Sequence, residues 1–284
     1  MSISKGKFTR GAVGALVCAA IFAPLQAAAG DIVRSGGTGS GLAMMRAIGE
    51  HYSAAHPDTT VEVLPSLGST GGIKAVAAKA IDIAIVANHV SREQAAQGLQ
   101  EGTCLRTGLI FATSRPKPTD MTAAQLPKIF ADANPTWPDG QALKVILRSR
   151  VGSENSYLIN AVPTMKDALE KAYERPGMPI GATDQDNADL AQRTGGSLAI
   201  MTLLQLRAEN LSLRPLSFEG VEPSLASLTA GKYALPLDLC LVTTAQPSAA
   251  AVRLMEYVRS SEGQKILRAF DALPLAATPR GVAG

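Results

Sequence analysis

The chain has 284 residues, with 27 basic and 24 acidic side chains and an aromatic content of only 4%. Its basic residues form no run and are not interleaved with aromatic residues, which argues against nucleic acid as a partner. The length suffices for one large domain or two domains of ordinary size.

The first 29 residues have the pattern of an export signal. A basic start with Lys5, Lys7 and Arg10 precedes an apolar stretch over residues 11–25, and three alanines stand before Gly30. That stretch is too short for a comfortable membrane span, and no later stretch approaches about 18 uninterrupted apolar residues. We therefore predict a soluble mature protein, periplasmic or secreted, with a cleaved signal peptide at 1–29.

Two cysteines, Cys104 and Cys240, remain in the mature chain. An even number permits one disulfide in an exported protein. Both residues lie in or beside apolar runs, however, where a reduced cysteine packs as a small hydrophobic residue. The sequence favours the reduced form and leaves the disulfide as the alternative. The cysteines and the three histidines show no metal-ligand spacing, so we expect no metal site.

Strand and helix patterns alternate along the mature chain. Apolar runs predict strands at 31–33, 60–64, 81–86, 108–113, 144–147, 198–201 and 237–243. Helical spacing predicts helices at 41–56, 71–79, 92–99, 123–130, 153–162, 165–173, 187–194, 226–230 and 248–270. Such alternation predicts an α/β fold with helices on both faces of largely parallel sheets, and ligands of these folds lie at the carboxyl ends of strands.

Three loops rich in glycine and hydroxyl groups lie between an apolar run and a helical pattern, at 35–41, 63–74 and 148–156. A strand, a tight turn and a helix start together present amide N–H groups at the positive end of the helix dipole, which suits an anion. One such corner is explained equally well as a capped turn without a ligand. Because there are three, we predict one pocket assembled from separate loops.

The sequence contains no recognisable catalytic motif. The G-x-S-x-G elbow is absent, Leu42 stands where a dinucleotide-binding motif requires glycine, and Lys74 is followed by alanine where a P-loop requires Ser or Thr. We expect a protein that is not an enzyme, with an exported hydrolase as the most distant alternative.

Several short motifs follow one another along the mature chain: S-G-G-T-G-S-G, L-G-S-T-G-G-I-K-A, A-I-D-I-A-I-V-A-N-H-V-S, R-S-R-V-G-S-E-N-S and S-S-E-G-Q-K-I-L. Their shared order resembles that of the phosphate-binding periplasmic receptors of ABC importers. The resemblance implies a two-lobed type II periplasmic binding protein with a mixed, mostly parallel sheet in each lobe. It implies a small ligand, phosphate or another oxyanion, an ABC transporter permease as partner and no cofactor. We expect a monomer.

Composition changes at the proline-interrupted segment 115–118 and again near 233–236. We interpret these segments as the places where the chain leaves the first lobe and later returns to it. The predicted division is therefore a first lobe from 30–115 and 237–284, and a second lobe from 116–236.

The resemblance also implies which residues bind the ligand. They are Thr38, Gly39 and Ser40 in the first loop, Ser69, Thr70 and Gly71 in the second, Ala87 and Asn88 after the third strand, and Arg148, Ser149, Arg150, Gly152, Ser153, Glu154 and Asn155 in the second lobe.

Three of these positions depart from the family pattern. Ala87 stands where phosphate receptors often carry an aspartate, Ser149 where an arginine is expected, and Glu154 where a glycine is expected. A carboxylate about 4 Å from a bound oxyanion costs several kcal/mol at an effective dielectric constant near 20, unless Arg148 or Arg150 neutralises it or it points outward. The alternatives are a different oxyanion, a zwitterionic or cationic small molecule, or no ligand at all. The alternative function is that of a degenerate relative that works as a sensor or secretion adaptor without anion transport.

Overall fold

The computed structural model describes residues 1–2, 30–87 and 89–276. The signal-peptide prediction falls almost entirely, and Asn88 entirely, outside these residues. None of the helices in the described part is both long and apolar enough to cross a membrane.

The strands form one curled, mixed sheet with the order β2-β1-β3-β9-β4-β7-β5-β6, and the short strands β8 and β10 also pair with β4. The bounds are β1 Asp31–Gly37, β2 Thr59–Val63, β3 Ile83–Val86, β4 Leu99–Thr113, β5 Lys144–Arg148, β6 Ile180–Gly181, β7 Ser197–Thr202, β8 Arg214–Pro215, β9 Pro236–Thr244 and β10 Leu273–Pro274. Every residue of β3 and β7 is buried. These strands read as continuous apolar runs because the sheet is covered on both faces.

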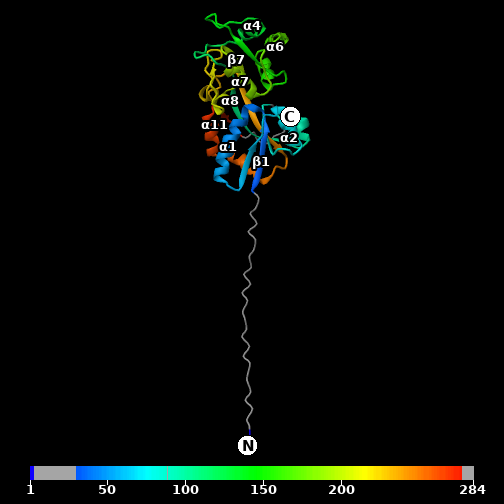
Figure 1. Cartoon of the computed structure of the whole chain (residues 1–284). Coiled ribbons are helices and arrows are strands. Elements are labelled where there is room, and N and C mark those ends of the chain that lie inside the picture. The colour runs from blue at the N-terminus through cyan, green and yellow to red at the C-terminus, as the bar shows by residue number, and fades with distance from the viewer. Residues whose placement is uncertain (3–29, 88, 277–284) are drawn as a thin grey trace.

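The molecule has two lobes, and β4 belongs to both of them. Residues 99–108 of β4 pair with β9 in the lobe that also contains β1, β2 and β3, whereas residues 109–112 pair with β7 in the other lobe. Figure 1 shows the first lobe in the blue, cyan, orange and red of both chain ends, and the second in the green and yellow of the middle. The residues that divide the lobes stay a prediction.

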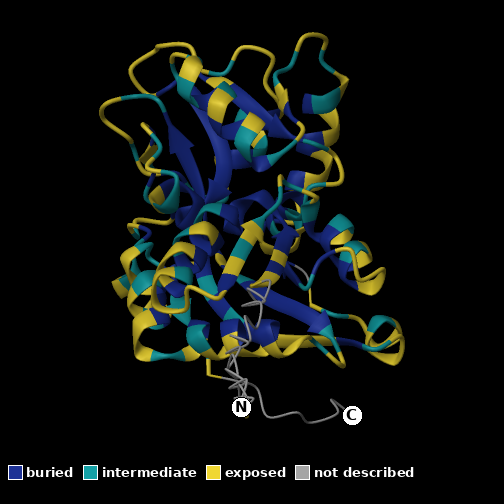
Figure 2. Cartoon of the chain, turned by 60° about the horizontal axis from the view of Figure 1, so that its bottom comes forward, coloured by how far each residue is buried: buried dark blue, intermediate teal, exposed yellow. Residues whose placement is uncertain are grey.

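The helices cover the two sheet faces, and Figure 2 shows the buried strands between their partly exposed surfaces. The bounds are η1 Gly39–Gly41, α1 Leu42–Ala55, α2 Gly68–Ala77, α3 Arg92–Ala96, α4 Leu126–Ala131, α5 Ser153–Ala161, α6 Met165–Glu174, α7 Asp184–Arg193, α8 Leu203–Ala208, α9 Leu225–Thr229, α10 Ala249–Arg259 and α11 Ser261–Ala269.

Several elements differ from the sequence predictions. The single helix predicted at 248–270 is two helices, because Ser260 takes an extended conformation and its side chain accepts a hydrogen bond from the Gly263 amide at the start of α11. Residues 97–99 leave the helix predicted at 92–99, since Gly98 has φ +86° and β4 begins at Leu99. Helix α8 and the two-residue strands β6, β8 and β10 were not predicted.

Cys104 and Cys240 form a disulfide, so the preference for reduced cysteines was wrong. The two residues lie directly opposite each other on the antiparallel strands β4 and β9, with Cα atoms 4.1 Å apart. They are separated by 136 positions in the sequence, so the bond closes a long loop that contains the whole second lobe.

We predict that the double variant Cys104→Ala, Cys240→Ala loses about 2–5 kcal/mol of unfolding free energy, because the bond restricts the unfolded chain over a long loop. Guanidinium unfolding of the variant and of the wild type measures the difference. Wild type treated with a reductant is the control and should match the variant. Equal unfolding midpoints for all three samples would show that the bond contributes nothing.

Candidate functional site

A cavity of about 510 Å³ lies between the two lobes, where the three predicted loops meet. Its lining comprises Thr38, residues 66–70, Arg148, Ser149, residues 151–154 and residues 182–184. The first two groups come from the first lobe and the others from the second. The last group belongs to a fourth loop, which sequence reasoning missed.

Close contact between β1 and β3 positions the first loop. Gly37 has φ +124°, and a Cβ atom there would lie 2.1 Å from the carbonyl oxygen of Ile85, so only glycine fits. The next residue, Thr38, donates its amide to that same oxygen at 2.8 Å and lines the cavity. Its hydroxyl lies 3.1 Å from that of Ser40. Ser40 and Gly39 are buried behind this wall and do not line the cavity.

The second loop places the start of α2 at the cavity. Residue Leu67 precedes this helix and provides no side-chain cap, so the first amides of α2 are not capped from that position. The Ser69 hydroxyl accepts a hydrogen bond from the Ala87 amide at 3.0 Å, which leaves its own hydrogen for another acceptor. Thr70 also lines the cavity, whereas Gly71 and Ala87 do not.

The third loop connects β5 to α5 and brings Ser149, Gly152, Ser153 and Glu154 to the cavity. Asn155 does not line the cavity but stabilises this loop, since its side-chain amide donates to the Ser149 carbonyl and to the Tyr173 hydroxyl, each at 2.9 Å.

Of the two candidate arginines, Arg148 lines the cavity and is buried, with 5% of its surface exposed. Arg150 does not line the cavity: it pairs with Glu170 at 2.5 Å and lies over the Tyr173 ring, 4.3 Å from its centroid.

The fourth loop follows the short strand β6 and begins α7. The Thr183 hydroxyl accepts from the Asp186 amide, and the Asp186 side chain accepts from the Thr183 amide, which forms a capping box. This cap starts α7 at Asp184, three residues before the predicted start. The T-x-x-D spacing was the signal in the sequence that could have revealed it.

Three charged side chains form a buried group in the cavity wall. The Arg148 guanidinium lies 3.5 Å from a Glu154 carboxylate oxygen and 3.4 Å from an Asp184 carboxylate oxygen, and it also donates to the Thr183 carbonyl. Glu154 and Asp184 are only 2% and 4% exposed. With both carboxylates ionised, this group carries one net negative charge.

The environment of Asp184 changes its protonation. Burial raises the pKa of Asp184 from 3.8 to about 7, and the nearby charge of Glu154 adds to the rise while Arg148 opposes it. The net charge of the cavity wall therefore changes near neutral pH.

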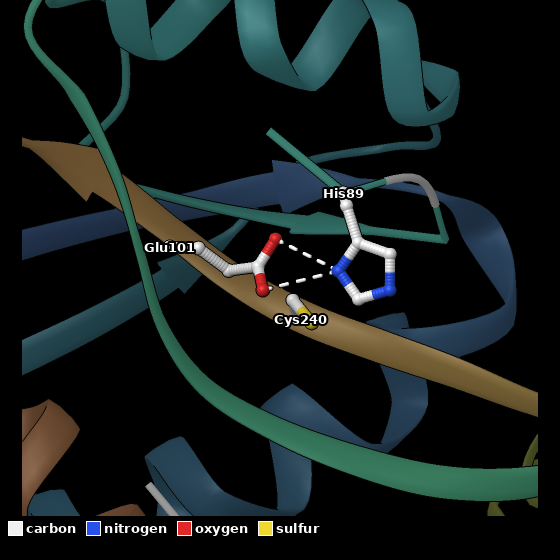
Figure 3. Close-up of side chains that lie close together, drawn as sticks. All are labelled: His89, Glu101 and Cys240. Carbon is white, nitrogen blue, oxygen red and sulfur yellow. Dashed lines mark hydrogen bonds and ion pairs between the residues drawn. The ribbon is translucent and has the colours of Figure 1, made fainter. Parts of the chain in front are cut away.

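A second cluster of potential ligand atoms lies outside the cavity. Figure 3 shows His89, Glu101 and Cys240 close together, with ligand atoms within 4.8 Å of one another. The disulfide takes up the Cys240 sulfur, so the cluster offers an ion only the imidazole and the carboxylate, and protein zinc sites use three or four ligands. We therefore do not place the functional site here.

We predict that the titration of Asp184 lowers stability as pH rises from about 4 to about 7. A pKa above its unfolded value means that the folded state holds the proton more tightly, so this contribution is complete at low pH and is lost as the folded carboxyl ionises. The unfolding free energy should fall by about 2–3 kcal/mol more between about pH 5 and pH 8 in the wild type than in Asp184→Asn. Urea unfolding at both pH values measures this.

Asp189→Asn, an exposed change on the same helix, is the control and should behave as wild type. An identical pH difference for all three proteins would contradict the assignment.

Comparison with known proteins agrees with this architecture. The phosphate-binding protein PstS of Borreliella burgdorferi is 24% identical over 212 residues, which cover 70% of this chain and 75% of that protein. A solved structure from Clostridium perfringens, a substrate-binding protein of a phosphate ABC transporter with bound phosphate, aligns with a TM-score of 0.74 at 17% identity, covering 87% of this chain and 100% of that chain. An ABC-type phosphate transport receptor from Vibrio cholerae gives a TM-score of 0.60 at 17% identity, covering 86% and 100%.

A family model described as a PBP superfamily domain matches residues 23–262, which is most of the chain. The protein thus belongs to the PBP superfamily and has its two-lobed type II fold.

Proposed function

We propose that this protein is an exported, non-catalytic receptor that binds a small oxyanion, phosphate first, in the cavity between its lobes. The observation that carries the proposal is the convergence of the hydroxyl-rich loops and of the start of α2 on one cavity. The phosphate-binding relatives support it. We further propose that the receptor acts as a monomer and delivers the ligand to an ABC transporter permease, and the similarity to receptors of phosphate ABC transporters supports the second part.

The first-lobe wall supplies groups that replace water around an anion. The hydroxyls of Thr38, Ser69 and Thr70 lie beside the amides at the start of α2. Such N–H and O–H dipoles stabilise an oxyanion without a buried counter-charge. The Ser153 hydroxyl adds a donor from the second lobe.

Arg148 does not act as a free counter-ion for the ligand, because Glu154 and Asp184 already pair with it. When Asp184 is protonated, the three side chains together are neutral, and when it is ionised they repel an anion. The proton on Asp184 therefore controls how well an inorganic anion binds.

Contacts between the lobes fit closure around a ligand. The Tyr157 hydroxyl on α5 donates to the Ala87 carbonyl at 2.9 Å, and the Gln185 side chain on α7 donates to the Gly39 carbonyl at 3.0 Å. Both bonds join the second lobe to the first. A hinge in β4 and in the segment that leads into β9 would make and break them, and ligand contacts from both lobes would favour the closed state.

We predict that Thr70→Val weakens phosphate binding by roughly tenfold or more, because a hydrogen bond to a charged group contributes about 1.5–3 kcal/mol. Isothermal titration of the purified protein with phosphate measures the change. Thr60→Val, exposed on β2 and away from the cavity, is the matched control and should bind as wild type. Absence of binding for phosphate, sulfate, molybdate and organic phosphonates in the wild type would refute the proposed function.

We also predict that sulfate binding weakens by about tenfold from about pH 6 to about pH 8, because ionised Asp184 repels the anion across the cavity. Sulfate is the suitable probe, since its own charge is constant over this range. The groups that face Asp184 are Arg148 on β5 and Glu154 on α5. Asp184→Asn should bind sulfate equally at both pH values, and an unchanged pH dependence in this variant would exclude Asp184 as the cause.

A further inference from the structure

Charge is distributed unequally between the two walls of the cavity. The first-lobe wall, Thr38 and residues 66–70, contains hydroxyls, backbone amides and one leucine but no charged side chain. The second-lobe wall contains all three charged residues of the lining, Arg148, Glu154 and Asp184. A ligand between the walls therefore meets a neutral surface of hydrogen-bond donors on one side and an ionic surface on the other.

Two of the helices that begin at the cavity have a carboxylate of the protein itself in their first turn. Glu154 is the second residue of α5, and Asp184 is the first residue of α7. A carboxylate in the first helical turn interacts with the positive end of the dipole in the way that a bound anion does. Since these two carboxylates also pair with Arg148, the only cation among the described residues of the second-lobe wall of the cavity is already compensated. The start of α2 remains for the ligand's oxyanion.

The ionic wall has the charge that suits a cation. Both carboxylates are more than nine-tenths buried, and they face a single guanidinium, which leaves one net negative charge when both are ionised. An ammonium group placed against them would restore neutrality, whereas a second anionic group would be repelled.

The size and the apolar part of the cavity indicate an organic ligand. An inorganic oxyanion has only five heavy atoms, whereas about 510 Å³ lies within the range of roughly 300–1,000 Å³ that is typical of pockets for organic ligands. Leu67 from the first lobe and Val151 from the second line the cavity with 40% and 94% of their surfaces exposed. They provide apolar contacts for a short carbon chain.

We propose that the preferred ligand is a zwitterion, a phosphonate or phosphate monoester joined by a short carbon chain to an ammonium group. Its oxyanion binds at Ser69, Thr70 and the start of α2, and its ammonium binds at Glu154 and Asp184. This inference rests on the proposed oxyanion-binding function and specifies the substrate class of the same site.

Calorimetric titration of the wild type at neutral pH with 2-aminoethylphosphonate, propylphosphonate, propylamine and inorganic phosphate tests the inference. Propylphosphonate replaces the ammonium by a methyl group of similar size, and propylamine lacks the oxyanion. We expect 2-aminoethylphosphonate to bind at least about tenfold more tightly than each of the other three, a difference of about 1.4 kcal/mol.

The double variant Glu154→Gln, Asp184→Asn should lose or reverse the preference over propylphosphonate, because Arg148 is then uncompensated and attracts the more negative ligand. The matched control Asp189→Asn should retain it. These variants test the assigned residues, while the comparison of ligands in the wild type does not depend on their folding.

The alternative outcomes separate the two proposals. If inorganic phosphate or propylphosphonate binds as tightly as 2-aminoethylphosphonate, this inference is wrong and the oxyanion receptor stands. If no probe binds, or if propylamine binds as tightly as 2-aminoethylphosphonate, the oxyanion receptor is wrong as well. A preference that survives in the double variant would remove Glu154 and Asp184 from the recognition of the ammonium.

Discussion

The cavity depends on one electrostatic constraint, the placement of Arg148 between the carboxylates of Glu154 and Asp184. Removing three charged groups from water is costly unless they compensate one another, and here two acids share one base. The compensation is therefore incomplete, and burial together with the charge of Glu154 raises the pKa of Asp184. Because all three side chains lie in the wall of the cavity, a cationic group bound there would compete with the proton to complete the charge balance.

The fold supports this group from both lobes. Arg148 ends β5, and the parallel strand β6 beside it leads into the loop that carries Asp184. The first lobe comes close at the same point: a Cβ atom on Gly39 would lie 2.7 Å from an Asp184 carboxylate oxygen. Glycine at this position thus permits the two lobes to approach at the charged group. The long strand β4 pairs in both lobes and therefore connects them through one continuous strand.

Local sequence patterns predicted the parts of this arrangement that local forces determine. The strand at 144–147 and the helix start at Ser153 follow from apolar periodicity and turn chemistry, and the observed elements are Lys144–Arg148 and Ser153–Ala161. The sequence also predicted that three loops form one pocket, and the structure brings residues from all three to one cavity.

The features that sequence reasoning missed depend on pairing between distant segments. Strand β6 has only two residues and forms because it pairs with β5. Two residues are too few to give a periodic pattern, so the sequence did not predict this strand or the loop with Asp184 that follows it. The disulfide requires the register of β4 against β9 across 136 positions. The orientations of Arg148 and Arg150 differ because Glu170, on the neighbouring helix α6, pairs with Arg150, which a linear sequence does not show.

The structure changes the effect that the sequence predicts for the glutamate at position 154. From the sequence alone, Glu154 replaces the glycine expected in phosphate receptors, and its carboxylate would repel an oxyanion. A neighbouring arginine would cancel that repulsion. Arg148 does lie beside it, but Asp184 lies on the other side of the same guanidinium and returns the wall to a net negative charge. A single cation cannot neutralise two anions, so a further positive charge has to come from a proton or from the ligand. On the proposed function, the glutamate would thus change the site from one that only accepts an anion to one that also requires a positive charge beside it.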